Sequence, residues 1–280
     1  MRRGARRTGT TVRMQVVKGV LLVAFLVIFL IPVYVLLVTS FKPLSEADPT
    51  GAWRLPEIWS VEAWVAVGEA LAPGLWNSVR LVVPGAIISA ILGSLNGYVL
   101  SKWRFPYADL VFTLFLFGMF IPYQAVMIPL VQLMTSVNLI GSVTGLMLAH
   151  VVYGIPICTL IFRNYFASMP DELVEAARTD GAGMFGTYLY VMVPNAAPAF
   201  AVVLIWQFTS MWNDFLFAVF LTTPENWPVT VLLNNLAGSM VQPYSQQMAG
   251  AILASLPTLV VYLLLGRFFM RGLMAGALKG

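Results

Sequence analysis

The sequence predicts an all-α membrane protein that crosses the bilayer six times. Apolar residues make up 59% of the 280 residues and charged residues only 10%, whereas a soluble domain carries about 25% charged residues. A water-soluble fold of this length cannot bury so much apolar surface, so the solvent must be lipid. The remaining charges fall between long apolar runs, and one cysteine, Cys158, excludes a disulfide framework and a cysteine-based metal cluster.

The predicted spans are bounded by charges and by polar breaks. A helix that rises about 1.5 Å per residue needs roughly 20 residues to cross the hydrocarbon core. Uncharged runs of that length follow Lys18 and Arg80. The uncharged run between Asp109 and Arg163 is too long for one helix, and the polar segment 135–142 divides it. In order, the expected spans are residues 19–40, 80–101, 108–134, 142–163, 198–222 and 248–269, all in a single domain of residues 1–280.

Two groups of prolines interrupt this pattern. Prolines recur within the polar stretch 43–76, and because proline breaks helices we expect a loop there rather than one continuous helix. Pro122 and Pro129 lie inside the third span. Proline at that depth frees carbonyl groups that must face protein or a cavity. We therefore expect a kinked helix near a translocation path, with a purely structural kink as the alternative.

The basic residues set the orientation. If six spans alternate, thirteen of the sixteen lysines and arginines share the side that holds both termini, and Lys42, Arg54 and Arg80 fall opposite. The positive-inside rule then places both termini in the cytoplasm and the loop 43–76 outside. This placement explains the net charge without a nucleic-acid partner. A cleaved signal peptide is the alternative for residues 1–40. It predicts a shorter apolar core followed by a small-residue cleavage site, and neither is present.

The loop 168–194 between the fourth and fifth spans predicts two short helices. Gly181 ends the first, since glycine adopts the left-handed conformation without steric cost. On that helix Leu173, Ala176 and Ala177 share one face. Two alanines leave the face flat enough for another protein to approach closely. From periodicity alone, an ordinary amphipathic connector remains the alternative.

The spacing of residues in this loop resembles a known motif. Residues 175–177 (Glu-Ala-Ala), Gly181 and residues 191–194 (Val-Met-Val-Pro) are similar to the "EAA" loop of permease subunits in binding-protein-dependent ATP-binding-cassette importers. Two conservative valines are the only departures from the pattern Glu-Ala-Ala, three residues, Gly, nine residues, Ile-x-Leu-Pro. Further segments resemble the second permease subunit of maltose-type and glycerol-phosphate-type systems: residues 77–78, 101–105, 163–166, 169–173, 180–182, 212–215 and 276–280, with Pro122 and Pro129.

The resemblance implies a transport subunit with no catalytic residue, metal or cofactor of its own, in a bacterial or archaeal cytoplasmic (inner) membrane. ATP and magnesium would bind to two cytoplasmic ATPase subunits, and a second permease and an extracytoplasmic solute-binding protein would complete the complex. Independently, a phosphate-binding loop needs Gly-Lys-Ser/Thr, and none of the four lysines follows a glycine. The residues implied in ATPase coupling are Leu173, Glu175, Ala176, Ala177, Asp180 and Gly181.

Polar residues inside the spans suggest a path. Asp214 is the one acid well inside a predicted span, and a carboxylate there is by default functional or paired. Trp212 and Asn213 precede it, and an aromatic ring beside hydrogen-bonding groups suits a sugar. A structural hydrogen-bond network near the outer end is the alternative. Other candidates for the path are Tyr123, Gln124, Asn96 and Gln207, whereas His150 stands alone in the sequence and predicts no metal site.

Small residues form a ridge on the second span. Gly85, Ser89, Gly93 and Gly97 recur every four residues, and such ridges let helices approach closely in lipid. Packing within this chain is the first interpretation, and packing against a second permease is the other.

These features predict a permease that forms half of a path for a sugar or related polyol. One alternative is a different polar solute, such as a peptide. A second is a stand-alone secondary transporter, which would need buried titratable pairs and an inverted repeat, and for which Asp214 alone is poor support. A third, a membrane scaffold without transport, leaves the motif at 175–194 unexplained.

Overall fold

The computed structural model describes residues 6–103, 105–238 and 243–277, with side chains from residue 14 to residue 268 outside the same gaps. Arg104 and several basic residues near the termini, which enter the orientation argument, lie outside this described part. The described elements are helices joined by loops. The chain divides into two compact units, Met1–Ala70 with Leu236–Leu253, and Leu71–Asn235 with Ala254–Gly280.

The first unit contains α1 (Arg6–Ser40) and a folded loop. The side chains of α1 between residues 14 and 34 are almost all exposed and mostly apolar, as a lipid-facing span requires. In the loop, the Lys42 Nζ atom is buried and donates to the carbonyl of Gly51 at 2.6 Å. The ring of Phe41 stacks on Trp64 with 5.3 Å between centroids. The segment after α1 is therefore held in place by its own contacts.

The helix α2 (Glu62–Lys102) begins earlier than the sequence predicts. It runs through Pro73 and Pro84, so residues 62–76 of the expected loop 43–76 are helical. Leu71, Leu81 and Val82 are buried along it. The packing of this long helix outweighs the local penalty of its prolines, which a reading of residue types cannot weigh.

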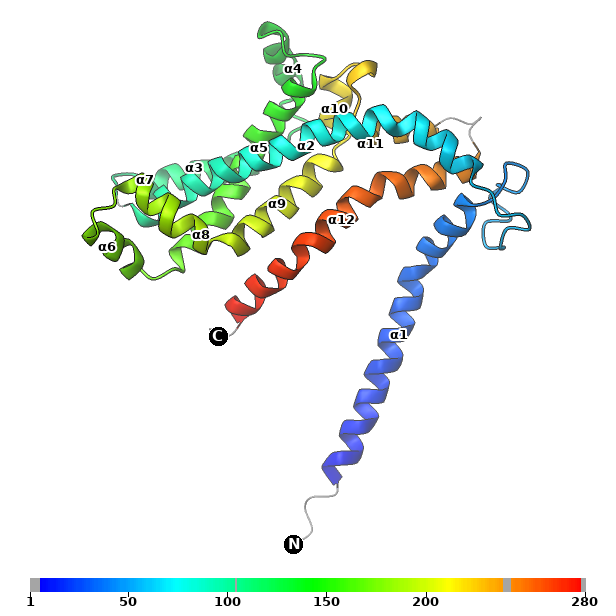
Figure 1. Ribbon diagram of the computed structural model, residues 1–280, viewed down its shortest axis with the longest axis horizontal. Coiled ribbons are helices and arrows are strands. Elements are labelled where there is room, and N and C mark those ends of the chain that lie inside the picture. Colours follow the sequence, from blue (N-terminus) through cyan, green and yellow to red (C-terminus); the bar gives the residue numbers. More distant parts are fainter. Residues whose placement is uncertain (1–5, 104, 239–242, 278–280) are drawn as a thin grey trace. The chain divides into compact units, whose positions relative to one another are not determined.

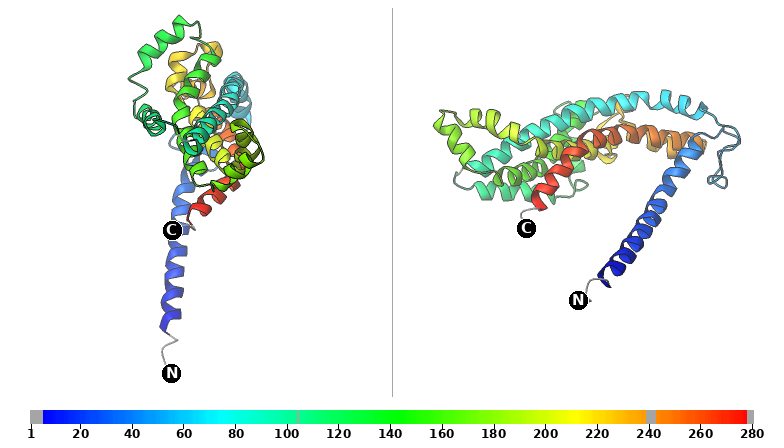
Figure 2. Two further views of the ribbon diagram at one scale, coloured as in Figure 1. Left: turned by 90° about the vertical axis from the view of Figure 1, so that its left-hand side faces the viewer. Right: turned by 60° about the horizontal axis from the view of Figure 1, so that its bottom comes forward.

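The second unit holds α3 to α10 and most of α2, α11 and α12. Figures 1 and 2 show α6, α7 and α8 gathered at one end of α2, α5 and α9, with α4 and α10 at the other end of α5. The bounds are α3 (Ala108–Met119), α4 (Met127–Ser136), α5 (Val143–Ala167), α6 (Glu172–Thr179), α7 (Met184–Thr187), the π-helix η1 (Tyr188–Met192), α8 (Val193–Asn195), α9 (Ala197–Trp212), α10 (Leu216–Leu221), the 3₁₀ helix η2 (Pro224–Asn226), α11 (Val229–Gly238) and α12 (Tyr244–Ala277).

Four described helices are long and apolar enough to cross a membrane, namely Met14–Ser40, Glu62–Lys102, Val143–Ala167 and Tyr244–Phe268. A fifth is counted if Met184–Asn195 and Ala197–Trp212, bent by 79° to each other, form one broken span. The chain is thus a helical multi-pass membrane protein. Its shorter apolar helices include α3 and α4.

Two predicted spans are interrupted. The expected span 108–134 consists of α3 and α4, with Pro122 in the link between them, while Pro129 lies in the first turn of α4, where its missing N–H costs little. The expected span 198–222 breaks between α9 and α10. There the Asp214 carboxylate accepts hydrogen bonds from the N–H groups of Phe217 and Ala218 and so starts a new helix.

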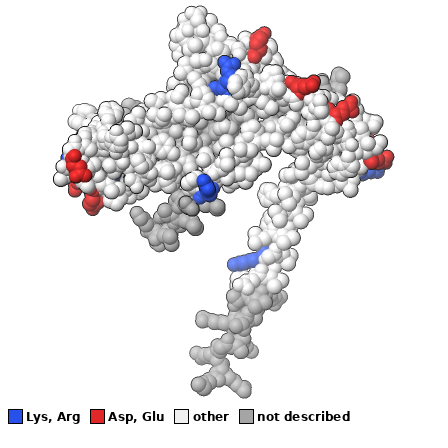
Figure 3. Space-filling view, in the orientation of Figure 1, with Lys and Arg blue, Asp and Glu red and all other residues white. Residues whose placement is uncertain are grey.

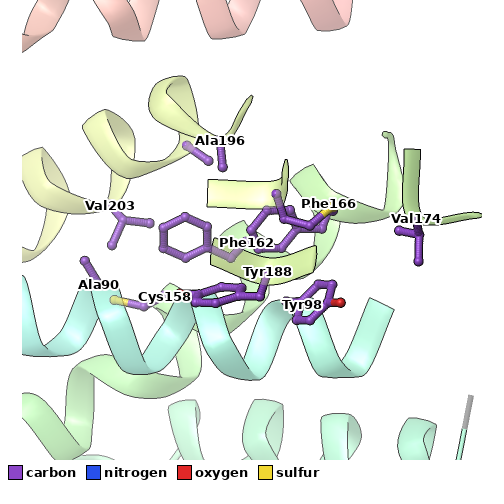
Figure 4. Packing of buried hydrophobic residues seen from close by; sticks show 11 residues of the cluster. Ala90, Tyr98, Cys158, Phe162, Phe166, Val174, Tyr188, Ala196 and Val203 are labelled. Atoms are coloured by element: carbon purple, nitrogen blue, oxygen red, sulfur yellow. The ribbon is translucent and has the colours of Figure 1, made fainter. Parts of the chain in front are cut away.

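The small-residue ridge of α2 packs within the chain. A Cβ atom added at Gly93 would lie 2.3 Å from Cys158 Cβ, and one added at Gly97 would lie 2.6 Å from Phe162 Cβ, both on α5. Ser89 accepts a hydrogen bond from Gln207 of α9. The small-residue ridge therefore packs α2 against α5 and α9. This confirms the interpretation that the ridge packs within the chain. Figure 4 shows the aromatic cluster that continues this core, including Phe162, Phe166, Tyr98 and Tyr188.

Candidate functional site

A cavity of about 640 Å³ opens between α5, α9 and α10. Its aromatic lining includes Trp206 on α9, which is 55% exposed, and Tyr153 on α5. The full set of lining residues is Met119, Tyr123, His150, Tyr153, Gly154, Ile157, Trp206, Gln207, Ser210, Asn213, Asp214, Phe215, Leu216 and Phe217. Neither lysine nor arginine is among these described residues. The cavity offers aromatic faces and neutral hydrogen-bonding groups beside one carboxylate.

Asp214 is paired rather than isolated. His150 Nε2 lies 3.3 Å from Asp214 Oδ2, although the geometry at His150 is too poor for a regular hydrogen bond. The same carboxylate caps α10 through the two backbone N–H groups of Phe217 and Ala218. Asp214 therefore takes part in a structural hydrogen-bond network, which was the alternative to a role in the path, and it also lines the cavity. His150 was the residue that sequence reasoning missed here.

The ring of Phe217 lies among three other rings of the cavity. Its centroid is 5.3 Å from that of His150, 5.4 Å from Tyr123 and 5.2 Å from Tyr153. Residues from α5, from the α3–α4 link and from α10 thus meet at one side chain. This contact joins the interrupted third span to the cavity wall, which supports a break near a path more than an isolated kink.

Gln207 fastens the cavity wall to two other helices. Its Nε2 atom donates to Ser89 Oγ and to the His150 carbonyl, each at 3.2 Å. A Cβ atom at Gly154 would lie 2.1 Å from this nitrogen, so a larger residue there would displace the Gln207 amide from its present position. Gln207 is buried and lines the cavity. Buried amides that bridge helices in this way stabilise membrane bundles.

The predicted path residues divide into two groups. Tyr123, Gln207, Asn213 and Asp214 line the cavity. Trp212 does not, because it is buried against Phe208 and donates from Nε1 to the Ala254 carbonyl at 2.9 Å. The exposed Gln124 and the half-buried Asn96 also lie outside the lining. The sequence candidates therefore include residues at the cavity's end of α9, whereas the tryptophan that lines the cavity, Trp206, is not among them.

The loop 168–194 presents one helix outward. On α6 the buried side is formed by Val174 and Ala177, which is 6% exposed, so Ala177 supports the loop itself rather than an outer face. Glu175 and Ala176 are exposed, together with Leu173 on the flank. The expectation that Leu173, Ala176 and Ala177 all face outward is wrong for Ala177, which is buried, while Leu173 and Ala176 are exposed. The outward face is lined by Glu172, Glu175, Ala176 and Thr179.

The end of α6 is where the sequence predicts it, and the helix that follows is partly buried. Gly181 has φ +82° with no atom within 4 Å of an added Cβ, as expected of a helix-ending glycine. In η1, Tyr188 and Met192 are buried, whereas Leu189 is exposed. Figure 3 shows acidic side chains gathered where α6 lies, on a surface that otherwise carries few charges.

A family model described as "Binding-protein-dependent transport system inner membrane component" matches residues 83–274. This range covers the cavity and the whole loop 168–194.

The curated relatives include permeases of archaeal importers. The chain is 50% identical over 165 residues to a probable ABC transporter permease protein of Pyrococcus horikoshii, an alignment that spans 59% of this chain and only 60% of that protein. It is 32% identical to the glucose import system permease protein GlcU of Saccharolobus solfataricus, over 89% of this chain and 90% of the relative. It is 33% identical to the xylose/arabinose import permease protein XacI of Haloferax volcanii, with 92% of each chain covered.

Among solved structures, one similar chain comes from the crystal structure of a bacterial ABC transporter involved in the import of the acidic polysaccharide alginate. The TM-score is 0.79 at 24% identity, and the match covers 93% of this chain and 98% of that chain. At this identity the likeness shows the fold alone.

Proposed function

The chain belongs to the family of binding-protein-dependent transport system inner membrane components, and from that premise we propose that it forms half of the translocation path for a sugar or related polyol. It is a multi-pass inner-membrane permease subunit of an ABC importer. In the proposed complex it pairs with a second permease, and two ATPase subunits supply the energy.

The cavity is the observation that supports a sugar as cargo. Sugars present apolar ring faces and many hydroxyl groups, and the cavity offers Trp206, Tyr123 and Tyr153 beside Gln207 and Asn213. The absence of lysine and arginine from its described lining, with Asp214 present, favours a neutral saccharide over a phosphorylated one. The names of the relatives from S. solfataricus and H. volcanii, glucose and xylose/arabinose permeases, support the same class.

Uptake tests this assignment. Cells that express the importer are given labelled glucose, xylose, arabinose or glycerol phosphate, and we expect uptake of a neutral sugar. Trp206→Ala should lower that uptake several-fold, whereas Trp76→Ala, at another exposed tryptophan outside the cavity lining, should not. Uptake of glycerol phosphate alone would contradict the proposed cargo.

Asp214 requires a pair of variants because it has two contacts. Asp214→Asn keeps an oxygen acceptor for one of the two N–H groups at the start of α10, while removing the charge beside His150. Asp214→Ala removes both. We expect Asp214→Asn to assemble normally and to transport less, and Asp214→Ala to lose stability as well. Normal uptake by Asp214→Asn would leave Asp214 with the capping role alone.

The proposed ATPase-docking surface is the outward face of α6. Overpacking a close contact costs roughly 1–3 kcal/mol, so Ala176→Trp should weaken retention of the ATPase about 5- to 150-fold. Glu175→Ala should act similarly by removing a charge-assisted contact. Ala66→Trp, at an exposed alanine of α2, is the control. Full retention of the ATPase by both α6 variants would overturn this docking assignment.

Six spans with both termini in the cytoplasm complete the proposal. The interrupted pairs α3 with α4 and α9 with α10 would serve as the third and fifth spans. Broken helices are tolerated at membrane depth where they line a cavity, and both breaks reach the cavity through Tyr123 and Asp214.

A stand-alone transporter remains a weaker candidate. The His150–Asp214 contact is a titratable pair of the kind that such a protein requires. Family membership instead points to ATP as the energy source. ATP-independent uptake by the purified chain in liposomes would favour the stand-alone transporter.

A further inference from the structure

Three polar residues recur on one face of the last turns of α2. Ser94, Tyr98 and Lys102 are spaced four residues apart, so they lie above one another along the helix. Ser94 and Tyr98 are fully buried, and the side chain of Lys102 is 4% exposed. Buried polar groups in a helix of a membrane protein need partners, and all three find them in the loop 168–194.

Each of these residues holds a different part of the loop. The hydroxyl groups of Ser94 and Tyr188 are 2.5 Å apart, and Tyr188 lies in the π-helix η1. Tyr98 donates from its hydroxyl to the Met184 carbonyl, at the start of α7, at 3.2 Å. Figure 4 shows Tyr98 and Tyr188 close together, with 5.4 Å between ring centroids.

Lys102 completes the set at the start of the loop. Its Nζ atom donates to the Met169 carbonyl at 2.6 Å and to Asp171 Oδ1 at 2.5 Å, immediately before α6. The next residue, Trp103, carries the guanidinium of Arg178 over its ring at 4.7 Å, at the other end of α6. The proposed docking helix is thus held at its start by Lys102 of α2 and near its end by Trp103, the residue that follows α2.

The same helix also contacts the cavity side of this unit. Ser89 accepts from Gln207 in the cavity wall. About 24 Å from Ser94 along the helix, Ser78 accepts from the Val229 N–H, and Asn77 donates to the carbonyls of Glu225 and Trp227. Residues 225–229 follow α10, which forms part of the cavity wall.

We propose that Ser94, Tyr98 and Lys102 act as a clamp that makes α2 move together with the docking loop, so that nucleotide-driven movement of the loop reaches the cavity. This inference rests on the proposed docking of an ATPase on α6. The three are positioning residues, since they act through the loop and contact no solute. If the clamp is released, the ATPase still docks and hydrolyses ATP, but the cavity responds less.

The test uses a readout of the cavity that needs no identified solute. In a Cys158→Ala background, Ser210→Cys places a thiol in the cavity lining. The assembled importer in liposomes is treated with a polar maleimide, with and without Mg-ATP and vanadate. We expect the nucleotide to change the labelling rate of this thiol, and Tyr188→Phe, Ser94→Ala and Lys102→Met each to reduce that change at least about threefold while ATP hydrolysis continues.

Tyr190→Phe is the matched control, because it removes the same hydroxyl from the same π-helix at a side chain that is 77% exposed. It should leave the nucleotide response intact. Ser94→Ala with Tyr188→Phe should be no worse than either single change if the two hydroxyls act as one contact.

Two results separate the proposals. An ATPase that does not copurify with the unaltered chain would contradict the docking assignment. A retained ATPase with an unchanged nucleotide response in Tyr188→Phe, Ser94→Ala and Lys102→Met would overturn the clamp alone. Labelling is normalised to assembled complex, so a variant that assembles poorly is still judged by the response of the complexes that form.

Discussion

Replacing Gly97 by alanine should destabilise the packing of α2 against α5. A Cβ atom at Gly97 would lie 2.6 Å from Phe162 Cβ, 2.7 Å from the Arg163 nitrogen and 2.9 Å from the Phe162 carbonyl carbon. Two of these atoms belong to the backbone, so no side-chain rotation relieves the contact. Because ordinary contact begins at 3.4 Å, the helices would have to separate by roughly 0.8 Å in a close-packed interior.

The magnitude follows from two opposing terms. Overpacking costs about 1–3 kcal/mol, and replacing glycine by alanine inside a helix returns about 1 kcal/mol. Gly118→Ala is the matched control, since Gly118 lies in α3 with no atom within 4 Å of an added Cβ. Gly118→Ala gains the helix propensity of alanine without a steric clash. The two variants should therefore differ by about 1–3 kcal/mol, or roughly 2–10 °C in unfolding midpoint.

The assay heats detergent-purified permease and measures the monodisperse fraction that remains. We expect Gly97→Ala to lose its monodisperse form at a lower temperature than Gly118→Ala. Equal midpoints, or a higher midpoint for Gly97→Ala, would show that α2 and α5 do not approach as closely as the geometry requires.

Three further predictions concern other parts of the chain. Gln207→Leu should destabilise the purified permease by about 1–3 kcal/mol, measured by the same heating assay, because two buried acceptors lose their donor. With Cys158 removed, a cysteine at Asp48 should react with an impermeant thiol reagent from outside the cell and one at Thr179 should not; the reverse pattern would invert the proposed topology. The pKa of Asp48 is held below its usual value of 3.8, chiefly by the hydroxyl of Thr50. The resulting stabilisation is present above that value and is lost as the pH falls through the lowered pKa, so Asp48→Asn should flatten the acid side of a stability–pH curve.

Much of the fold follows from composition and spacing. The apolar content dictates lipid as the solvent, and the four-residue recurrence of Gly85, Ser89, Gly93 and Gly97 identifies the face of α2 that packs within the chain. The position of Gly181 marks the end of α6. These signals succeed because each depends on a local property, either the volume of a side chain or the backbone angle of one residue.

The features that local rules miss depend on tertiary contacts. Prolines led us to expect a loop up to residue 76, but α2 starts at Glu62 because packing along its length outweighs them. On α6, Ala176 is exposed and its neighbour Ala177 is buried against the rest of the loop. A short helix with two adjacent alanines does not itself reveal which one faces the core.

Sequence reasoning named Trp212 and missed Trp206, which lines the cavity, for a general reason. Trp206 and Trp212 are six residues apart, so they point about 120° apart around the helix. In a soluble protein the polar side would identify the outer face, but in lipid both faces are apolar and this contrast disappears. The remaining signal is the position of small and polar residues. His150, Gly154 and Cys158 recur every four residues on α5, as the ridge of α2 does, and all three contact or approach Gln207. The recurrence of small and polar residues every four positions, which identified the packing face of α2, also identifies a packing face of α5. That recurrence places His150 on an inward face near the cavity.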